Sequence, residues 1–148
     1  MTLNHFELNE AMLALKDFSI TTRHDFHKIP ELSGEEVKAS KMCREILHAA
    51  GYSIADFDAC TAFYAYLIVE PAFTTIAWRC EMVNLTNHHY STNHDGRSHN
   101  CGHGTHMAIS LTAAKYLPAN KSALPSGFCL QHIQWWHNSK SSYCKRTS

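Results

Sequence analysis

The sequence has no excess of either charge and no long apolar run. Its 148 residues contain 13 Lys and Arg against 13 Asp and Glu, so the formal charge is zero when the histidines are neutral. A protein that binds nucleic acid or an anionic membrane surface needs an excess of basic residues, so we expect neither partner. No apolar stretch approaches the roughly 20 residues that a membrane-spanning helix requires. These absences favour a soluble globular domain with no membrane or nucleic-acid partner.

The cysteines and the N-terminus also lack familiar patterns. The six cysteines include no C-x-x-C pair, and the N-terminus shows no basic segment followed by an apolar one. The second absence predicts that there is no secretory signal. Without secretion, we expect reduced thiols and a cytoplasmic location.

Local signals predict two helices in the first third of the chain. Apolar residues at helical spacing predict a helix over residues 8–27, with a bend near Thr21–Thr22. A capping box formed by Ser33 and Glu36 predicts the start of a second helix. Gly51 supplies the left-handed residue that ends it.

The remainder of the chain predicts a mixture of strands and one more helix. A third helix is expected over residues 107–117, with Pro118 ending it. Strands are predicted over residues 52–57, 61–69, 74–82 and 128–136, a polar loop over 84–100, and a loose polar tail over 138–148. This order of elements predicts an α/β layered domain.

Histidine is what the sequence has in abundance, with 12 residues, and the segment around Cys101 and His103 has the best spacing for a metal ion. Only Gly102 separates the two, so both side chains can converge on one ion. The predicted helix follows at once, and its N-terminal partial positive charge favours the Cys101 thiolate. Thiolate and imidazole together suit zinc or a similar divalent metal. His106, one helical turn later, could be a further ligand or a group that supports one.

The alternative interpretation of this segment is an exposed loop in which histidine has accumulated. C-x-H does not by itself supply the four ligands of a closed site. We expect His88, His89 and His94 to be surface residues.

Three segments of the chain resemble one known family. Cys101–His103 resembles the start of the C-G-H-D-G-H motif of metal-dependent amidohydrolases, the metallopeptidase family of hippurate, auxin-conjugate and aminoacylase-like hydrolases. Residues 23–33 resemble the family's R-R-D-x-H-x-x-P-E-L-S stretch, and residues 76–83 resemble its I-A-L-R-A-D-M-D strand end. The pieces occur in the family's order from about Thr21 to Leu117.

The resemblance implies a fold, a reaction and a cofactor. The implied fold is the N-terminal part of a zinc-peptidase-like layered catalytic domain, with a mixed sheet flanked by helices. The implied activity is hydrolysis of amide bonds in N-acyl amino acids or small peptides, which makes such a small molecule the expected substrate. The implied cofactor is a divalent metal, zinc or manganese, and Cys101 and His103 match the family's first two metal ligands.

Several positions depart from the family's pattern. The D-M-D sequence reads Glu81–Val83, and the Asp after C-G-H is Gly104. The family's Glu-Glu pair, which gives a general base and another ligand, falls on His137–Asn138. We therefore assign no catalytic residue and expect impaired hydrolysis, because a positioned acid or base typically contributes ~10²–10⁴ in rate. Glu81, His106 and His137 are the candidates for further ligands, and metal binding is expected to be weak.

The departures also bear on domain organisation. They predict a truncated metallohydrolase-like catalytic domain over residues 1–137, followed by the polar tail over 138–148. A sheet without its neighbouring strands would expose an edge, through which the chain could self-associate. Trp135–Trp136 would lie near that edge or be ordinary core residues. The alternative function is a non-catalytic remnant that acts as a metal-binding or interaction module, and a third is a domain with incidental histidines.

Overall fold

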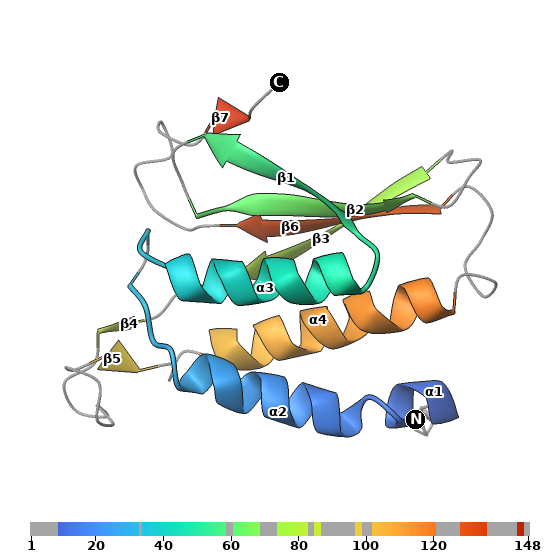
Figure 1. The fold of residues 1–148 in the computed structure, drawn as a ribbon, viewed down its shortest axis with the longest axis horizontal. Helices are drawn as coiled ribbons and strands as arrows, with labels where there is room; N and C mark the ends of the chain where they lie inside the picture. Colours follow the sequence, from blue (N-terminus) through green and yellow to red (C-terminus); the bar gives the residue numbers. More distant parts are fainter. Residues whose placement is uncertain are drawn as a thin grey trace, which may run out of the picture.

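A five-stranded mixed sheet carries three long helices on one of its faces (Figure 1). The computed structural model describes residues 9–32, 34–58, 61–68, 74–82, 85–86, 97–98, 102–120, 128–135 and 145–146. The helices are α1 (Glu10–Leu13), α2 (Lys16–His27), α3 (Val37–Ala49) and α4 (His103–Ala119). The strands are β1 (Ser53–Asp58), β2 (Phe63–Ile68), β3 (Thr74–Glu81), β4 (Leu85–Thr86), β5 (Arg97–Ser98), β6 (Phe128–Trp135) and β7 (Lys145–Arg146). The predicted α/β layering is confirmed.

The strand order is β3-β6-β2-β1-β7, and β4 and β5 form a separate pair. β6 runs parallel to β3 and antiparallel to β2, so the sheet is mixed, as expected. β4 and β5 lie within the predicted loop over 84–100, and β7 lies within the predicted loose tail. No helix in the described ranges is long and apolar enough to cross a bilayer.

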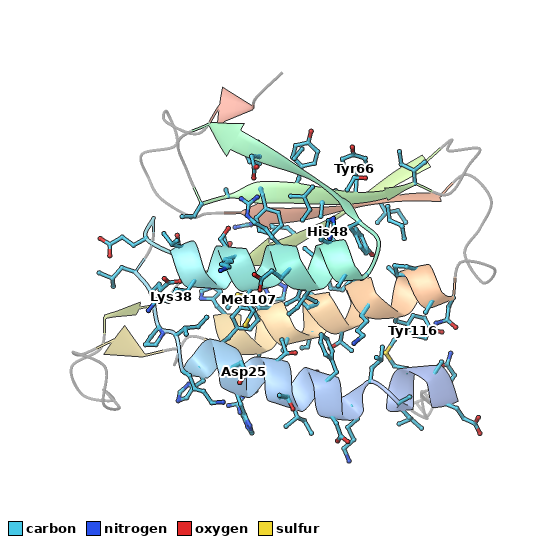
Figure 2. The ribbon with its side chains drawn as sticks, in the orientation of Figure 1. Asp25, Lys38, His48, Tyr66, Met107 and Tyr116 are labelled. Carbon is cyan, nitrogen blue, oxygen red and sulfur yellow. The ribbon has the colours of Figure 1, made fainter. Side chains whose placement is uncertain are left out.

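The core lies between the sheet and the helices. Along β2, Phe63, Ala65 and Leu67 are buried, whereas the residues between them are partly exposed. This alternation is that of a strand with one face against the core. Tyr66, on the other face, points away from the helices (Figure 2). The core side chains from the helices include Phe26, Cys43, Leu47, Met107 and Leu111.

The first helix is interrupted earlier than predicted. The break falls at Ala14–Leu15, between α1 and α2, whereas Thr21–Thr22 lies inside α2. The Thr22 side chain is buried, as is Phe26 one helical turn later. Packing of this face against the core therefore keeps both threonines helical despite the modest helix propensity of β-branched residues.

α3 has a different N-terminal cap from the predicted one. The Glu31 carboxylate accepts hydrogen bonds from the backbone N–H groups of Lys38 and Ala39, at 2.9 and 2.8 Å. Glu36 is fully buried and accepts from the Gly34 N–H and the Thr61 hydroxyl. Ser33 lies outside the described residues. A carboxylate from the preceding loop thus satisfies the first turn of α3.

The C-terminus of α3 is as predicted. Gly51 has a φ of 90°, in the left-handed region that glycine adopts without a side-chain clash. The Tyr52 N–H donates to the Leu47 carbonyl and the Gly51 N–H to the His48 carbonyl. These two bonds form a Schellman motif, which reverses the chain into β1.

α4 is longer than predicted at both ends. It begins at His103 instead of 107, after Gly102 with a φ of 86°, and it includes Pro118 in its last turn. The N–H groups of Thr105 and His106 donate to the Gly102 carbonyl, which begins the helix directly after the C-x-H segment. Pro118 has no backbone N–H to donate, yet the helix continues through Pro118 and ends at Ala119.

Candidate metal site

The carboxyl ends of β3 and β6 and the N-terminus of α4 meet on one side of the molecule (Figure 1). Glu81 is the last residue of β3 and pairs in register with Trp135, the last residue of β6. His103 is the first residue of α4. In α/β sheets, ligands bind at the carboxyl ends of strands, so this is the place where a site is expected.

Glu81 and His103 are in direct contact. The His103 Nε2 atom lies 2.9 Å from Glu81 Oε2, and the two side chains are 26% and 20% exposed. The other carboxylate oxygen of Glu81 accepts a hydrogen bond from the Arg79 guanidinium. Arg79, Glu81 and His103 thus form a partly buried chain of three side chains, in which Glu81 and His103 are 22 positions apart in the sequence.

The backbone on both sides of this contact is well fixed. Cys80 and Met82, on either side of Glu81, are 0% and 1% exposed. Gly104, directly after His103, is also buried. The Gly104 found in place of the family's Asp therefore lies in the first turn of the helix.

The donor types of the contact suit a divalent metal. Carboxylate oxygen and imidazole nitrogen both bind zinc and manganese. Two ligands on one tetrahedral zinc, each about 2.1 Å from the ion, would be about 3.4 Å apart, whereas the observed 2.9 Å is the distance of a hydrogen bond. Within the described ranges, no group of three or more His, Cys, Asp or Glu side chains could hold a metal ion.

The predicted ligands differ in what the structure says of them. His103 is the first residue of α4, whereas Cys101 lies outside the described residues, as do His88, His89, His94 and His137. His106 is half-buried on α4, and its carbonyl accepts the Ser110 hydroxyl at 2.8 Å. Among the described contacts, none joins the His106 ring to Glu81 or His103. Of the two candidate further ligands that the structure describes, Glu81 and His106, Glu81 contacts His103.

The sequence did not indicate the part played by Arg79. Its guanidinium and the Glu81 carboxylate project from the same face of β3, because they are two residues apart on a strand. The pair becomes part of the candidate site because the fold places His103 against Glu81.

The buried cysteine of α3 is a different kind of thiol from that expected at Cys101. Burial, and to a smaller extent the neighbouring Cys80, raises the pKa of the Cys43 thiol well above its ordinary value. A thiol held protonated in this way is a poor metal ligand, because the thiolate is the form that binds. Cys43 is therefore a core residue.

An apolar groove of the described surface lies away from this contact. It has a volume of about 670 Å³ and runs along α1, α2 and α4, where Leu13, Ile20 and Ile109 line it. Neither Glu81 nor His103 is among its lining residues. Tyr116 of α4 lies beside α1, where its hydroxyl accepts a hydrogen bond from Asn9 at 2.7 Å (Figure 2).

The fold is similar to that of solved M20 peptidase structures. The YxeP protein of Bacillus subtilis, a dinuclear metal-binding peptidase from the M20 family, matches with a TM-score of 0.76 and 24% identity. The match covers 88% of this chain and 37% of that protein. An aminobenzoyl-glutamate utilization protein from Klebsiella pneumoniae matches with a TM-score of 0.68 and 18% identity, over 88% of this chain and 39% of that one. The expected zinc-peptidase-like fold is confirmed.

Sequence relatives point in the same direction. An N-acetyldiaminopimelate deacetylase of Ligilactobacillus salivarius is 29% identical over 118 residues, which are 76% of this chain and 31% of the relative. One of Streptococcus pneumoniae is 32% identical over 100 residues, 62% of this chain and 27% of the relative. The chain thus spans about a third of the length of these relatives and resembles their N-terminal part, which confirms the resemblance expected from the motifs. No protein-family model matches the sequence.

Proposed function

We propose that the chain forms part of a metal-dependent amidohydrolase that acts on small N-acyl amino acids or peptides. The observation that carries this proposal is the contact between Glu81 and His103 at the ends of β3 and β6. The names of the sequence relatives make an N-acetylated amino acid such as N-acetyldiaminopimelate the first substrate to test. Hydrolysis would consume one water and release acetate and the amino acid.

Cys101 and His103 would hold a divalent ion, zinc or manganese, in this proposal. Such an ion would supply a Lewis acid for the amide carbonyl and a water of lowered pKa. The Arg79–Glu81 ion pair would lie beside His103 and hold a polar group in a fixed position. The M20 relationship of the fold supports a metal, since one structural neighbour is a dinuclear metal-binding peptidase.

We also propose that hydrolysis by this chain alone is slow. The family's Glu pair corresponds to His137–Asn138, and Glu81 already accepts hydrogen bonds through both of its oxygens. No carboxylate is therefore assigned as the base that would take a proton from the attacking water. The non-catalytic metal-binding module is the outcome that the same experiment would reveal if turnover were absent.

The test combines metal analysis with an activity assay on the purified chain. Bound zinc and manganese are measured by elemental analysis for the wild type, Cys101→Ser, His103→Ala and the control His48→Ala, which removes an exposed histidine of α3. Acetate release from N-acetyldiaminopimelate and other N-acetyl amino acids is measured on the same samples.

We expect one ion or less per wild-type chain, lost in Cys101→Ser and His103→Ala but kept in His48→Ala. Slow acetate release that disappears with the metal supports the amidohydrolase. Metal without any release supports the binding module instead. Metal content unchanged in all three variants, or absent from the wild type, would contradict the proposed site.

A further inference from the structure

We propose that Glu81 is a positioning residue that fixes the His103 ring with its proton on Nε2, so that Nδ1 is the nitrogen that binds the metal. The inference deepens the proposed function and rests on it, because it assigns His103 to the same metal site. It distinguishes two roles for Glu81. One is a direct ligand, and the other is a residue that orients a ligand.

The hydrogen bond itself indicates which nitrogen carries the proton. An ionised carboxylate only accepts hydrogen bonds, so the atom 2.9 Å from Glu81 Oε2 has to donate. That atom is His103 Nε2. In a neutral imidazole the second nitrogen is then an acceptor with a lone pair, and this lone pair is what a metal ion takes. Histidine ligands of metals commonly donate their other N–H to a carboxylate in this way.

The Arg79 guanidinium makes Glu81 a poor direct ligand. It pairs with Glu81 Oε1 and offsets the negative charge that would attract a cation. It also fixes the carboxylate so that Oε2 is directed toward His103. The distance of 2.9 Å is that of a hydrogen bond, whereas two ligands on one tetrahedral zinc stand about 3.4 Å apart.

Both ends of the contact are held by secondary structure. The register of β3 with β6 fixes the backbone of Glu81, and the buried Cys80 and Met82 hold it on both sides. The first turn of α4 fixes the backbone of His103. An orienting carboxylate needs this rigidity, because a tautomer is selected only if the partner stays in place.

The family's motif has Asp at the position of Glu81. The Glu side chain is longer by one methylene, and this length lets the carboxylate reach the His103 ring. An Asp on the same backbone would end one methylene, or about 1.5 Å, short of the His103 ring. Glu81→Asp should therefore break the hydrogen bond while keeping the charge. This variant separates the effect of contact from the effect of charge.

The experiment measures the protonation of the His103 ring and the affinity for zinc in the full chain. Nitrogen-15 NMR of histidine-labelled protein at neutral pH distinguishes protonated, unprotonated and metal-bound ring nitrogens. The His103 signals are assigned by their loss in His103→Gln. The variants are Glu81→Gln, Glu81→Ala and Glu81→Asp, and Asp56→Asn is the control because Asp56 is an Arg-paired carboxylate of β1. Zinc affinity is measured by competition with a chelator.

We expect the metal-free wild type to carry the His103 proton on Nε2, and zinc to shift the signal of Nδ1. Glu81→Ala and Glu81→Asp should lower zinc affinity by about 10–100-fold, the usual effect of losing an orienting partner. Glu81→Gln can still accept through its amide oxygen and should keep most of the affinity. Asp56→Asn should bind zinc as the wild type does.

Other outcomes overturn the inference in recognisable ways. A proton on Nδ1 in the metal-free chain, or a zinc-induced shift at Nε2, would refute the orientation. Equal losses in Glu81→Gln and Glu81→Ala would identify Glu81 as a direct ligand. A wild type that binds no zinc refutes the metal-binding nitrogen and the proposed site together, whereas zinc binding with the wrong tautomer refutes the inference alone.

Discussion

Glu36 offers the sharpest test of how the start of α3 is held. Its side chain is fully buried, and Oε2 accepts hydrogen bonds from the Gly34 N–H and the Thr61 hydroxyl, each at 2.9 Å. Oε1 is buried with no hydrogen-bond partner in the described structure. The residue therefore joins the loop before α3 to the loop before β2. The perturbation is Glu36→Ala, with Glu36→Gln as its matched variant.

The expected magnitude follows from the two hydrogen bonds. Each contributes about 1 kcal/mol net, and loss of the acceptor adds the cost of donors left partly buried. We therefore expect Glu36→Ala to lower the free energy of unfolding by about 2–4 kcal/mol. For a chain of this length that corresponds to a drop in Tm of roughly 4–16 °C. Glu36→Gln keeps an acceptor oxygen at the same position and should change stability by less than about 1 kcal/mol.

The assay is urea unfolding followed by far-ultraviolet circular dichroism, with Glu45→Ala as the control. Glu45 is exposed on α3, and its carboxylate lies 3.9 Å from the Lys41 ammonium, so its loss should stay within about 0.5 kcal/mol. A Glu36→Ala variant as stable as the control would refute the reasoning. So would a Glu36→Gln variant as unstable as Glu36→Ala, because the loss would then come from the charge and not from the acceptor.

Three further predictions test other contacts. Burial raises the pKa of the Tyr52 hydroxyl, so the stability gained by keeping it protonated is present below about pH 10 and is lost as the pH rises above that value. Tyr52→Phe should therefore flatten the fall in the free energy of unfolding between about pH 9 and 11, and an unchanged slope would contradict this. The Trp78 indole N–H donates to the Ser110 hydroxyl at 2.9 Å. Trp78→Phe and Ser110→Ala should each lower the free energy of unfolding in urea by about 1 kcal/mol, and the double variant should lose less than the sum. Additive losses would show that the hydrogen bond contributes nothing. Ile76 and Trp78 are 47% and 40% exposed on β3, which is a terminal strand in the described sheet order. We expect self-association through this edge, so Ile76→Lys should shift the chain toward monomer in analytical ultracentrifugation. An unchanged distribution of species would refute this edge as the contact.

Features encoded within a few residues were predictable from the sequence. The left-handed end of α3 follows from Gly51, and the presence of a helix after the C-x-H segment follows from local spacing, although α4 begins at His103 and not at the predicted residue 107. The α1–α2 break at Ala14–Leu15 was not predictable, because both residues are compatible with a helix. Burial of Thr22 overrides the weak local preference that favoured a bend seven residues later.

The candidate site was predictable only in part, for a similar reason. The motif resemblance identified His103 as a ligand candidate and Glu81 as a surviving carboxylate. Their contact depends on the register between β3 and β6 and on where α4 starts, which are tertiary features. The Arg79 pairing and the Glu31 cap were missed, since each depends on where a long flexible side chain is directed.

The central position of β6 has a consequence for how the protein is made. β1, β2 and β3 leave the ribosome before β6, yet in the described sheet β3 is joined to β2 only through β6. The β1–β2 hairpin and β3 therefore cannot share a sheet until residues near 135 have been synthesised. Until that moment the nascent chain exposes two unpaired strand edges, and such edges are templates for aggregation. A chain that lacks β6 is therefore the form in which unpaired strand edges most favour aggregation.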